Sequence, residues 1–221
     1  MVAAATRKRN GITLTVKNIF LYPRLCDMAL VASAYVKVSA STVIEPYQLL
    51  GCANSDEIHA IRCKVAALCN VEMNSIRDIY SCSPLQEGLT AISVTNPGYY
   101  IAQHFFELPQ TVELEQLHKA WAYAIEKTPT LRPRIVQLES RLVQAVIEQK
   151  FQWQEGQDLK EYATRDKSSP MLLGDPLVRF TVVEESAKRF LVFFLHHAIY
   201  DGWSFPLLLE AVIKTYDGDT T

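Results

Sequence analysis

The second half of the chain alternates between strand-like and helix-like hydrophobic patterns. From Tyr100 to Leu108, apolar and polar positions alternate, which is typical of a strand with one buried face. From Phe190 to His197 the chain is almost wholly apolar, as expected of a strand covered on both faces. Shorter apolar runs predict three more strands, at residues 134–138, 142–147 and 177–183.

Apolar residues at helical spacing predict helices around these strands. Residues 55–70 carry one apolar stripe behind Ser55, the expected N-cap. Thr111 is expected to cap a second helix, and Ser204 a last helix that ends near Tyr216. Residues 76–80 and 84–89 predict a short extended piece and a turn. Apolar residues are spaced as in strands in some segments and as in helices in others, which predicts one domain that contains both.

The first quarter of the chain predicts a different organisation. Residues 1–37 indicate a helix end, a loop and a short helix after Pro23. Residues 38–54 predict a linker, because Ser39, Pro46 and Gly51 interrupt any sustained period. We therefore expect a domain boundary in this linker and the main domain over residues 55–221.

The composition favours a folded domain and excludes several partner classes. Hydrophobic residues make up 49% of the 221 residues and charged residues 21%, which is enough apolar material for a buried core. A net charge of −2 gives no electrostatic reason to expect nucleic acid or an anionic membrane as partner. No apolar run reaches the roughly 18 residues of a membrane span.

Five cysteines, an odd number without a Cys-x-x-Cys pair, argue against a zinc site or a disulfide framework. A reducing, cytoplasmic location and no bound metal are therefore expected. The first 26 residues are basic and lack acids, which is also a feature of transit peptides. A basic surface helix end is the preferred interpretation, because such targeting signals are loosely defined.

The candidate chemistry lies in one segment, His196 to Ser204, which reads His-His-Ala-Ile-Tyr-Asp-Gly-Trp-Ser. It joins the end of a buried strand to the start of a helix, where a rigid strand and an open loop commonly position catalytic side chains. Adjacent side chains on a strand point to opposite faces, so only one histidine can face a given cleft. Asp201 follows His197 by four positions, in a turn that Gly202 permits.

Three interpretations of this segment compete. The simplest is a pair of core histidines followed by a capped turn. A metal site built from His196, His197 and Asp201 lacks a further well-spaced ligand in the sequence. The third is acyl transfer, in which a neutral imidazole lies beside an activated acyl group. The whole pattern, with Asp-Gly-Trp-Ser, is more specific than an isolated His-x-x-x-Asp.

This segment resembles the His-His-x-x-x-Asp-Gly signature of condensation domains in non-ribosomal peptide synthetases. Ile76 to Leu89 resembles the opening motif of these domains, in the form common among fungal synthetases. Thr130 to Val136 resembles their second motif, which usually reads Leu-Arg-Thr-Arg. Pro133 replaces that threonine, and Lys127-Thr128-Pro129 departs from the usual Arg-His-Glu, so this match is weaker. The resemblance covers residues 74–218.

The resemblance implies an α+β fold, a chloramphenicol-acetyltransferase-like lobe in which a mixed sheet packs with helices. It also implies amide formation between substrates held as phosphopantetheine thioesters on peptidyl carrier domains, with no cofactor bound directly. His197, the second histidine, would orient or deprotonate the attacking amine, with His196 beside it. Asp201 would pair with Arg132 beneath the loop, and the Gly202 amide could face the developing oxyanion. Trp203 and Ser204 would support the loop.

Residues 11–29 resemble the last third of a peptidyl carrier domain, whose phosphopantetheine-bearing serine would lie upstream. The family's domain has two lobes, and this chain would supply the first. Little activity is then expected alone, because one wall of the substrate tunnel is absent. A non-catalytic remnant, or a docking piece that binds a carrier or a complementing half, is the alternative. A stand-alone His-x-x-x-Asp acyltransferase that uses coenzyme A is a further one.

Overall fold

The computed structural model describes residues 12–34, 44–52, 54–148, 153–156, 158–167 and 169–219. The chain divides into two compact units, Met1–Val43 and Ile44–Thr221. The division lies within the predicted linker, of which residues 38–43 and 53 fall outside the described ranges. The helix end expected in residues 1–10 also falls outside them.

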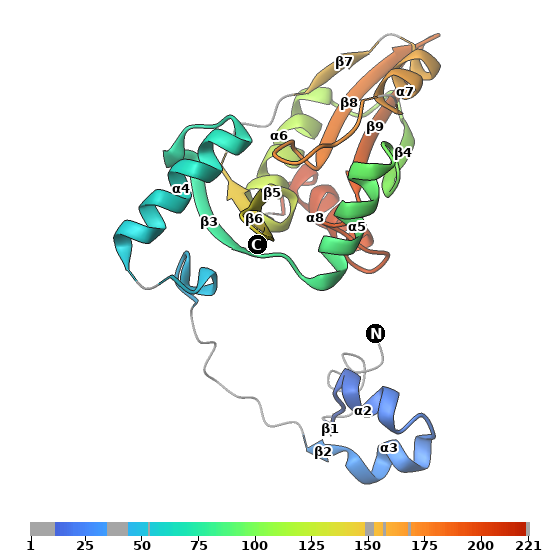
Figure 1. Cartoon of the computed structure of the whole chain (residues 1–221). Coiled ribbons are helices and arrows are strands. Elements are labelled where there is room, and N and C mark those ends of the chain that lie inside the picture. The colour runs from blue at the N-terminus through green and yellow to red at the C-terminus, as the bar shows by residue number, and fades with distance from the viewer. Residues whose placement is uncertain are drawn as a thin grey trace. The chain divides into compact units, whose positions relative to one another are not determined.

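The first unit is small and built from two short helices. Helix α2 (Val16–Leu21) begins behind Thr15, whose side chain accepts a hydrogen bond from the amide of Asn18. Helix α3 (Leu25–Val31) follows Pro23, as the sequence predicts. Strands β1 (Ile12–Thr13) and β2 (Ser33–Ala34), which precede and follow the helices in the sequence, pair antiparallel (Figure 1). Neither α2 nor this strand pair was expected from the sequence.

The second unit contains a three-stranded antiparallel sheet in the order β3-β6-β5. Its strands are β3 (Ile76–Ser81), β5 (Pro133–Leu138) and β6 (Arg141–Ile147). Helix α4 (Ser55–Cys69) buries Val65 and Cys69 against this sheet. Short 3₁₀ turns at Gln48–Leu50, Met73–Ser75 and Pro129–Leu131 connect the elements.

A four-stranded sheet in the order β4-β9-β8-β7 forms the rest of this unit. Strands β4 (Ile101–Leu108), β9 (Lys188–His196) and β8 (Val178–Glu185) are antiparallel neighbours, and β7 (Gln154–Gly156) runs parallel to β8. Helices α6 (Leu114–Lys127) and α8 (Ser204–Tyr216) share a core with one face of this sheet (Figure 1). Helix α7 (Leu159–Lys167) contributes Tyr162 to the core on the opposite face.

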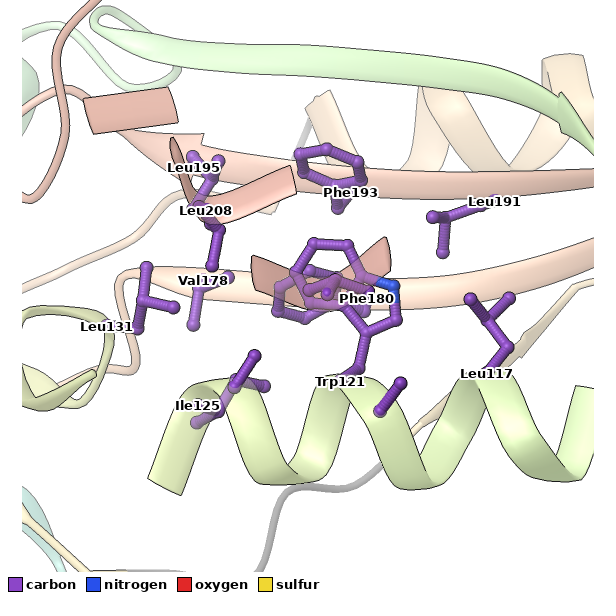
Figure 2. Packing of buried hydrophobic residues seen from close by; sticks show 13 residues of the cluster. Leu117, Trp121, Ile125, Leu131, Val178, Phe180, Leu191, Phe193, Leu195 and Leu208 are labelled. Carbon is purple, nitrogen blue, oxygen red and sulfur yellow. The ribbon is translucent and has the colours of Figure 1, made fainter. Parts of the chain in front are cut away.

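Strand β9 is buried on both faces, as its unbroken apolar run predicts. Phe193 belongs to the core shared with α6 and α8, and Phe194 belongs to the core on the other face. Figure 2 shows Trp121 pointing from α6 toward Phe180, with ring centroids 4.6 Å apart. Such aromatic contacts add about 0.5–1.5 kcal/mol to the free energy of burying the rings. The strand that carries the two histidines is therefore held firmly up to its last residue.

Three local predictions were wrong. Residues 84–89 are no turn but open helix α5 (Pro84–Thr95), because Ser83 and Gln86 form a capping box and proline suits the first helical position. Asn54, not Ser55, caps α4, since its side chain accepts from the amide of Glu57. Thr111 does not cap α6, which begins after Glu113 without a side-chain cap. Strand β7 and helix α7 were not predicted.

No helix in the described part of the chain is long and apolar enough to cross a membrane. All five cysteines are unpaired thiols.

Candidate functional site

The first histidine of the signature, His196, is enclosed in the fold. Its side chain is only 1% exposed. The ring atom Nε2 lies 2.8 Å from the Ser93 hydroxyl oxygen, and Nδ1 accepts a hydrogen bond of 3.1 Å from the amide of Ala198. Because Nδ1 accepts, the neutral ring carries its proton on Nε2 and donates it to Ser93. The ring is thus a structural connection between α5 and the loop.

Burial keeps this ring neutral. Burial, and to a smaller extent the neighbouring charge of His197, lowers the pKa of His196 to about 4. A ring that is enclosed and has both nitrogens in hydrogen bonds has no free atom for a substrate. His196, which the sequence placed among the catalytic candidates, therefore supports the site from inside.

The second histidine, His197, points the other way and is exposed. Its backbone amide donates to the carbonyl oxygen of Tyr100 at the start of β4, at 2.8 Å. Its ring stacks on the ring of Tyr200, with centroids 4.5 Å apart and planes inclined by 18°. The predicted division, one histidine inside and one outside, is what the structure has. His197 is the histidine of this pair that a substrate can reach.

Side chains of helix α5 hold the end of β9 and the loop after it by hydrogen bonds. Besides Ser93, it carries Gln86, whose Nε2 donates to the carbonyl oxygen of Ala198 at 3.0 Å. Gln86 also exchanges hydrogen bonds with Gln144 of β6. The opening motif and the histidine signature, more than 100 positions apart, are thus joined directly. Sequence reasoning missed Gln86 and Ser93 as site residues, although the capping box around Gln86 is visible in the sequence.

Asp201 holds the turn that leads into helix α8, whose N-cap residue is Trp203 and makes no side-chain cap hydrogen bond. Its Oδ1 accepts from the amides of Trp203 and Ser204, at 3.1 and 2.7 Å, and from the Ser204 hydroxyl at 2.8 Å. The Ser204 hydroxyl oxygen in turn accepts from the Asp201 amide at 2.9 Å. This reciprocal pattern has the form of a capping box across the turn. Ser204 is the first residue of α8 and not its N-cap, which corrects the expected role. Hydrogen bonds, first from the Ser204 amide and then from its hydroxyl, hold the pKa of Asp201 below its usual value.

The expected pair between Asp201 and Arg132 does not form. In the described residues no hydrogen bond or ion pair joins them, and Nη2 of Arg132 donates instead to the carbonyl oxygen of Glu126 at 3.2 Å. The physical reason is local. The carboxylate is already engaged by amides two and three positions ahead, and the guanidinium turns to the carbonyl end of α6, where a cation is favoured.

Gly202 adopts an ordinary backbone conformation with no positive φ. A methyl group placed on it would have nothing within 4 Å. The turn therefore does not use the conformational freedom that Gly202 was expected to supply. The missing side chain leaves open space at Gly202, which precedes the exposed Trp203 in the chain.

Arg134 of the second motif joins the end of helix α4 to the segment around Gly174. Its Nη1 donates to the carbonyl oxygen of Cys69, at the end of α4, at 2.6 Å, and to that of Gly174 at 3.1 Å. Burial lowers the pKa of Arg134 from its ordinary value. Gly174 has a φ of +86°, and an added Cβ would lie 2.3 Å from the carbonyl oxygen of Leu68. Here the fold does require glycine.

A metal at this loop finds no support in the geometry. The rings of His196 and His197 point in opposite directions, and the Asp201 carboxylate accepts hydrogen bonds from Trp203 and Ser204. Across the residues with described positions, no three His, Cys, Asp or Glu side chains gather as metal ligands would.

Comparison with known proteins identifies the family. A family model described as "Condensation domain" matches residues 76–221. Nonribosomal peptide synthetase ungA of Aspergillus violaceofuscus is 42% identical over 216 residues, which cover 96% of this chain and 2% of that protein. Nonribosomal peptide synthetase TES of Alternaria alternata is 41% identical over 209 residues, or 92% of this chain and 4% of that protein.

Solved structures agree on the fold. "The crystal structure of CT" superposes with a TM-score of 0.63 at 19% identity and covers 80% of this chain and 42% of that one. The starter condensation domain of rhizomide synthetase RzmA gives a TM-score of 0.56 at 18% identity, with 63% and 39% covered.

The fold and the matches together define part of a condensation domain, and the α+β, chloramphenicol-acetyltransferase-like prediction is confirmed. The chain belongs to the condensation-domain family of non-ribosomal peptide synthetases. The synthetases of Aspergillus and Alternaria are both fungal, in agreement with the form of the opening motif. The chain spans less than half of these solved structures and only a few per cent of these curated relatives.

Proposed function

We propose that this chain supplies the histidine-bearing part of a condensation domain that forms a peptide bond between two carrier-bound substrates. The donor acyl group and the acceptor amine arrive as phosphopantetheine thioesters, the amine attacks the thioester carbonyl, and a thiol leaves as the amide forms. His197 lies beside the reacting atoms and orients the amine or accepts its proton. No cofactor of the domain's own is needed for this reaction.

One observation carries the proposal. His197 is the exposed member of a histidine pair whose other member is locked between α5 and the loop, so its position is set by the fold while its ring stays accessible. A neutral imidazole in such a position can guide or deprotonate an amine that must be uncharged to attack. The open space at Gly202 leaves room for the thioester to approach the loop backbone.

The proposed reaction requires partner domains. Peptidyl carrier domains deliver both substrates, and the second lobe of the domain closes the tunnel. We interpret residues 11–29 as the end of a carrier domain that precedes the condensation domain. Without the second lobe we expect little amide formation, because water enters and the two thioesters are not aligned. A cytoplasmic location fits the carrier-bound substrates and stays a prediction.

The experiment uses a chimaera in which residues 44–221, the second compact unit, replace the matching segment of ungA, a relative that is 42% identical. Donor and acceptor thioesters on carrier domains are mixed with it, and the amide is measured by mass spectrometry. His197→Ala should reduce the rate by about 10²–10⁴, the usual contribution of a general acid–base group. His59→Ala, which removes an exposed histidine of α4, is the matched control.

Undiminished product from the His197→Ala chimaera would contradict the proposal. If the parent chimaera, folded and carrying both lobes, makes no amide either, the docking interpretation gains support. Binding of carrier domains to the unmodified chain, measured by calorimetry, then tests that interpretation. Amide formation from an acyl-coenzyme A donor without a carrier would favour the stand-alone acyltransferase.

A further inference from the structure

Three side chains with metal-binding atoms meet at helix α4, and none of them belongs to the loop after β9. His59 and Cys63 are one helical turn apart, so their side chains share a face of the helix. Nε2 of His59 lies 3.7 Å from Sγ of Cys63. The same Sγ lies 3.6 Å from Sδ of Met73, on the 3₁₀ turn that follows the helix. One ring nitrogen and one thioether sulfur are therefore gathered around one thiol.

The fold keeps Met73 beside the helix. Asn70 ends α4 with a φ of +50°, and the amide of Val71 donates back to the carbonyl oxygen of Ala66 at 3.0 Å. This form of helix ending reverses the chain. Nη2 of Arg62 then donates to the carbonyl oxygen of Met73 at 3.2 Å, and the Met73 side chain packs against the core cluster under α4. The thioether is thus placed next to Cys63 by contacts that need no ligand.

The two separations suit donors that share one metal ion. An ion bound at about 2.0–2.3 Å, with angles of about 100–120° between its ligands, holds nitrogen and sulfur donors about 3.3–4.0 Å apart. Both measured distances fall in this range. His59 and Cys63 are exposed and Met73 is partly buried, so an ion can reach the thiol from solvent.

The donor atoms select the kind of metal. Thiolate and thioether sulfur favour Cu(I), and imidazole is also a good ligand for copper. Zn²⁺ is ordinarily held by four Cys, His, Asp or Glu ligands. Among the residues with described positions, no third side chain of these four types joins His59 and Cys63. A soft ion that accepts three ligands therefore fits this group better than Zn²⁺ does.

We propose that His59, Cys63 and Met73 form a three-coordinate site for Cu(I). Cys63 loses its proton to solvent and binds as the thiolate, while His59 binds through the lone pair of Nε2 and keeps its proton on Nδ1. No electron is transferred, and one thiolate balances the charge of Cu⁺. The sequence gives little sign of the site, because its third donor is a thioether ten positions after the cysteine. The inference is independent of the proposed function.

The test titrates the whole chain with Cu(I). Tetrakis(acetonitrile)copper(I) is added without oxygen to the reduced protein and bicinchoninate, and the absorbance of the bicinchoninate complex reports the copper that the protein does not bind. The parent should bind one equivalent that is lost in Cys63→Ser. Cys26→Ser, which removes an exposed cysteine of the first unit, is the matched control and should bind copper as the parent does.

Two further variants separate a shared site from a thiol that acts alone. Met73→Leu and His59→Ala keep Cys63, and each should weaken binding of this equivalent by at least about tenfold. Urea unfolding without copper checks that each variant is folded. X-ray absorption at the copper edge of the parent should show two sulfur ligands and one nitrogen ligand.

Parent-like affinity in folded Met73→Leu or His59→Ala would overturn the inference, because the thiol alone would then account for binding. An equal loss of binding in Cys26→Ser and Cys63→Ser would overturn it as well. Displacement of the ion by an equal concentration of Zn²⁺ would contradict the choice of Cu(I). A chelator keeps copper out of the amide and unfolding assays, in which this site is empty and His59 plays no part.

Discussion

Replacing His196 by glutamine tests whether the enclosed imidazole makes stability depend on pH. The unfolded chain takes up a proton on this ring near pH 6.5, whereas burial in the folded chain delays protonation until about pH 4. Between these values the unfolded state binds more protons, so acid favours unfolding. The stabilisation by the neutral ring is complete above pH 6.5 and is lost as the pH falls toward 4.

The size of the effect follows from the two pKa values. Their difference, at about 1.4 kcal/mol for each pH unit, corresponds to about 3 kcal/mol of unfolding free energy. His196→Gln can still donate to Ser93 but cannot titrate, so this part of the pH dependence should disappear. Other acidic and basic groups contribute equally to both proteins and cancel in the comparison.

The assay is urea unfolding from pH 4 to pH 8, followed by tryptophan fluorescence, to which buried Trp121 contributes. The free energy of the parent should fall toward pH 4 by about 3 kcal/mol more than that of His196→Gln. His59→Gln, which removes an exposed histidine, should keep the parent's profile. Parallel profiles for the parent and His196→Gln would refute the reasoning, because they would mean that the ring is equally accessible to protons in both states.

The remaining predictions concern single changes in the same unit. Ser93→Ala should cost about 1–3 kcal/mol in urea unfolding, because Nε2–H of His196 loses its acceptor inside the fold; a cost near zero would argue against that bond. Gly174→Ala should lower the free energy of unfolding by about 2 kcal/mol or more, because φ is positive there and the added Cβ would meet Leu68. Gly202→Ala should change that free energy by less than about 1 kcal/mol and yet slow amide formation by the chimaera. Equal losses of stability in the two variants would contradict this contrast. The apolar side chains exposed on edge strand β4, such as Phe105, should make the chain self-associate in analytical ultracentrifugation, and a concentration-independent monomer would contradict that expectation.

The spacing of hydrophobic residues along the chain predicted the helices and strands that form the core. The unbroken run of β9 and the helical stripes of α4, α6 and α8 could be read directly, because each face packs on a neighbour along its whole length. The turn prediction at Pro84 failed because Gly88 and several β-branched residues obscure a helix that its capping box and its packing stabilise. Cap residues were wrong by a position or more, since several polar residues near a helix start offer similar side-chain oxygens.

Only part of the site could be predicted from the sequence, for a different reason. Strand alternation predicts that His196 and His197 point to opposite faces but not which of them is enclosed. That is decided by Ser93, which lies more than 100 positions away and has no local signal in the sequence. The role of Asp201 depended on a choice between a distant guanidinium and nearby amides, and in the fold the nearby amides engage the carboxylate.

The most direct test of the account is the single-turnover rate of amide formation per folded molecule in the chimaera that carries His197→Ala. We expect an unfolding free energy within about 0.5 kcal/mol of the parent, because the ring is exposed. We also expect a rate of amide formation that is lower by at least about a hundredfold. A stable variant that forms the amide at the parent's rate would contradict the claim that His197 lies at the reacting centre.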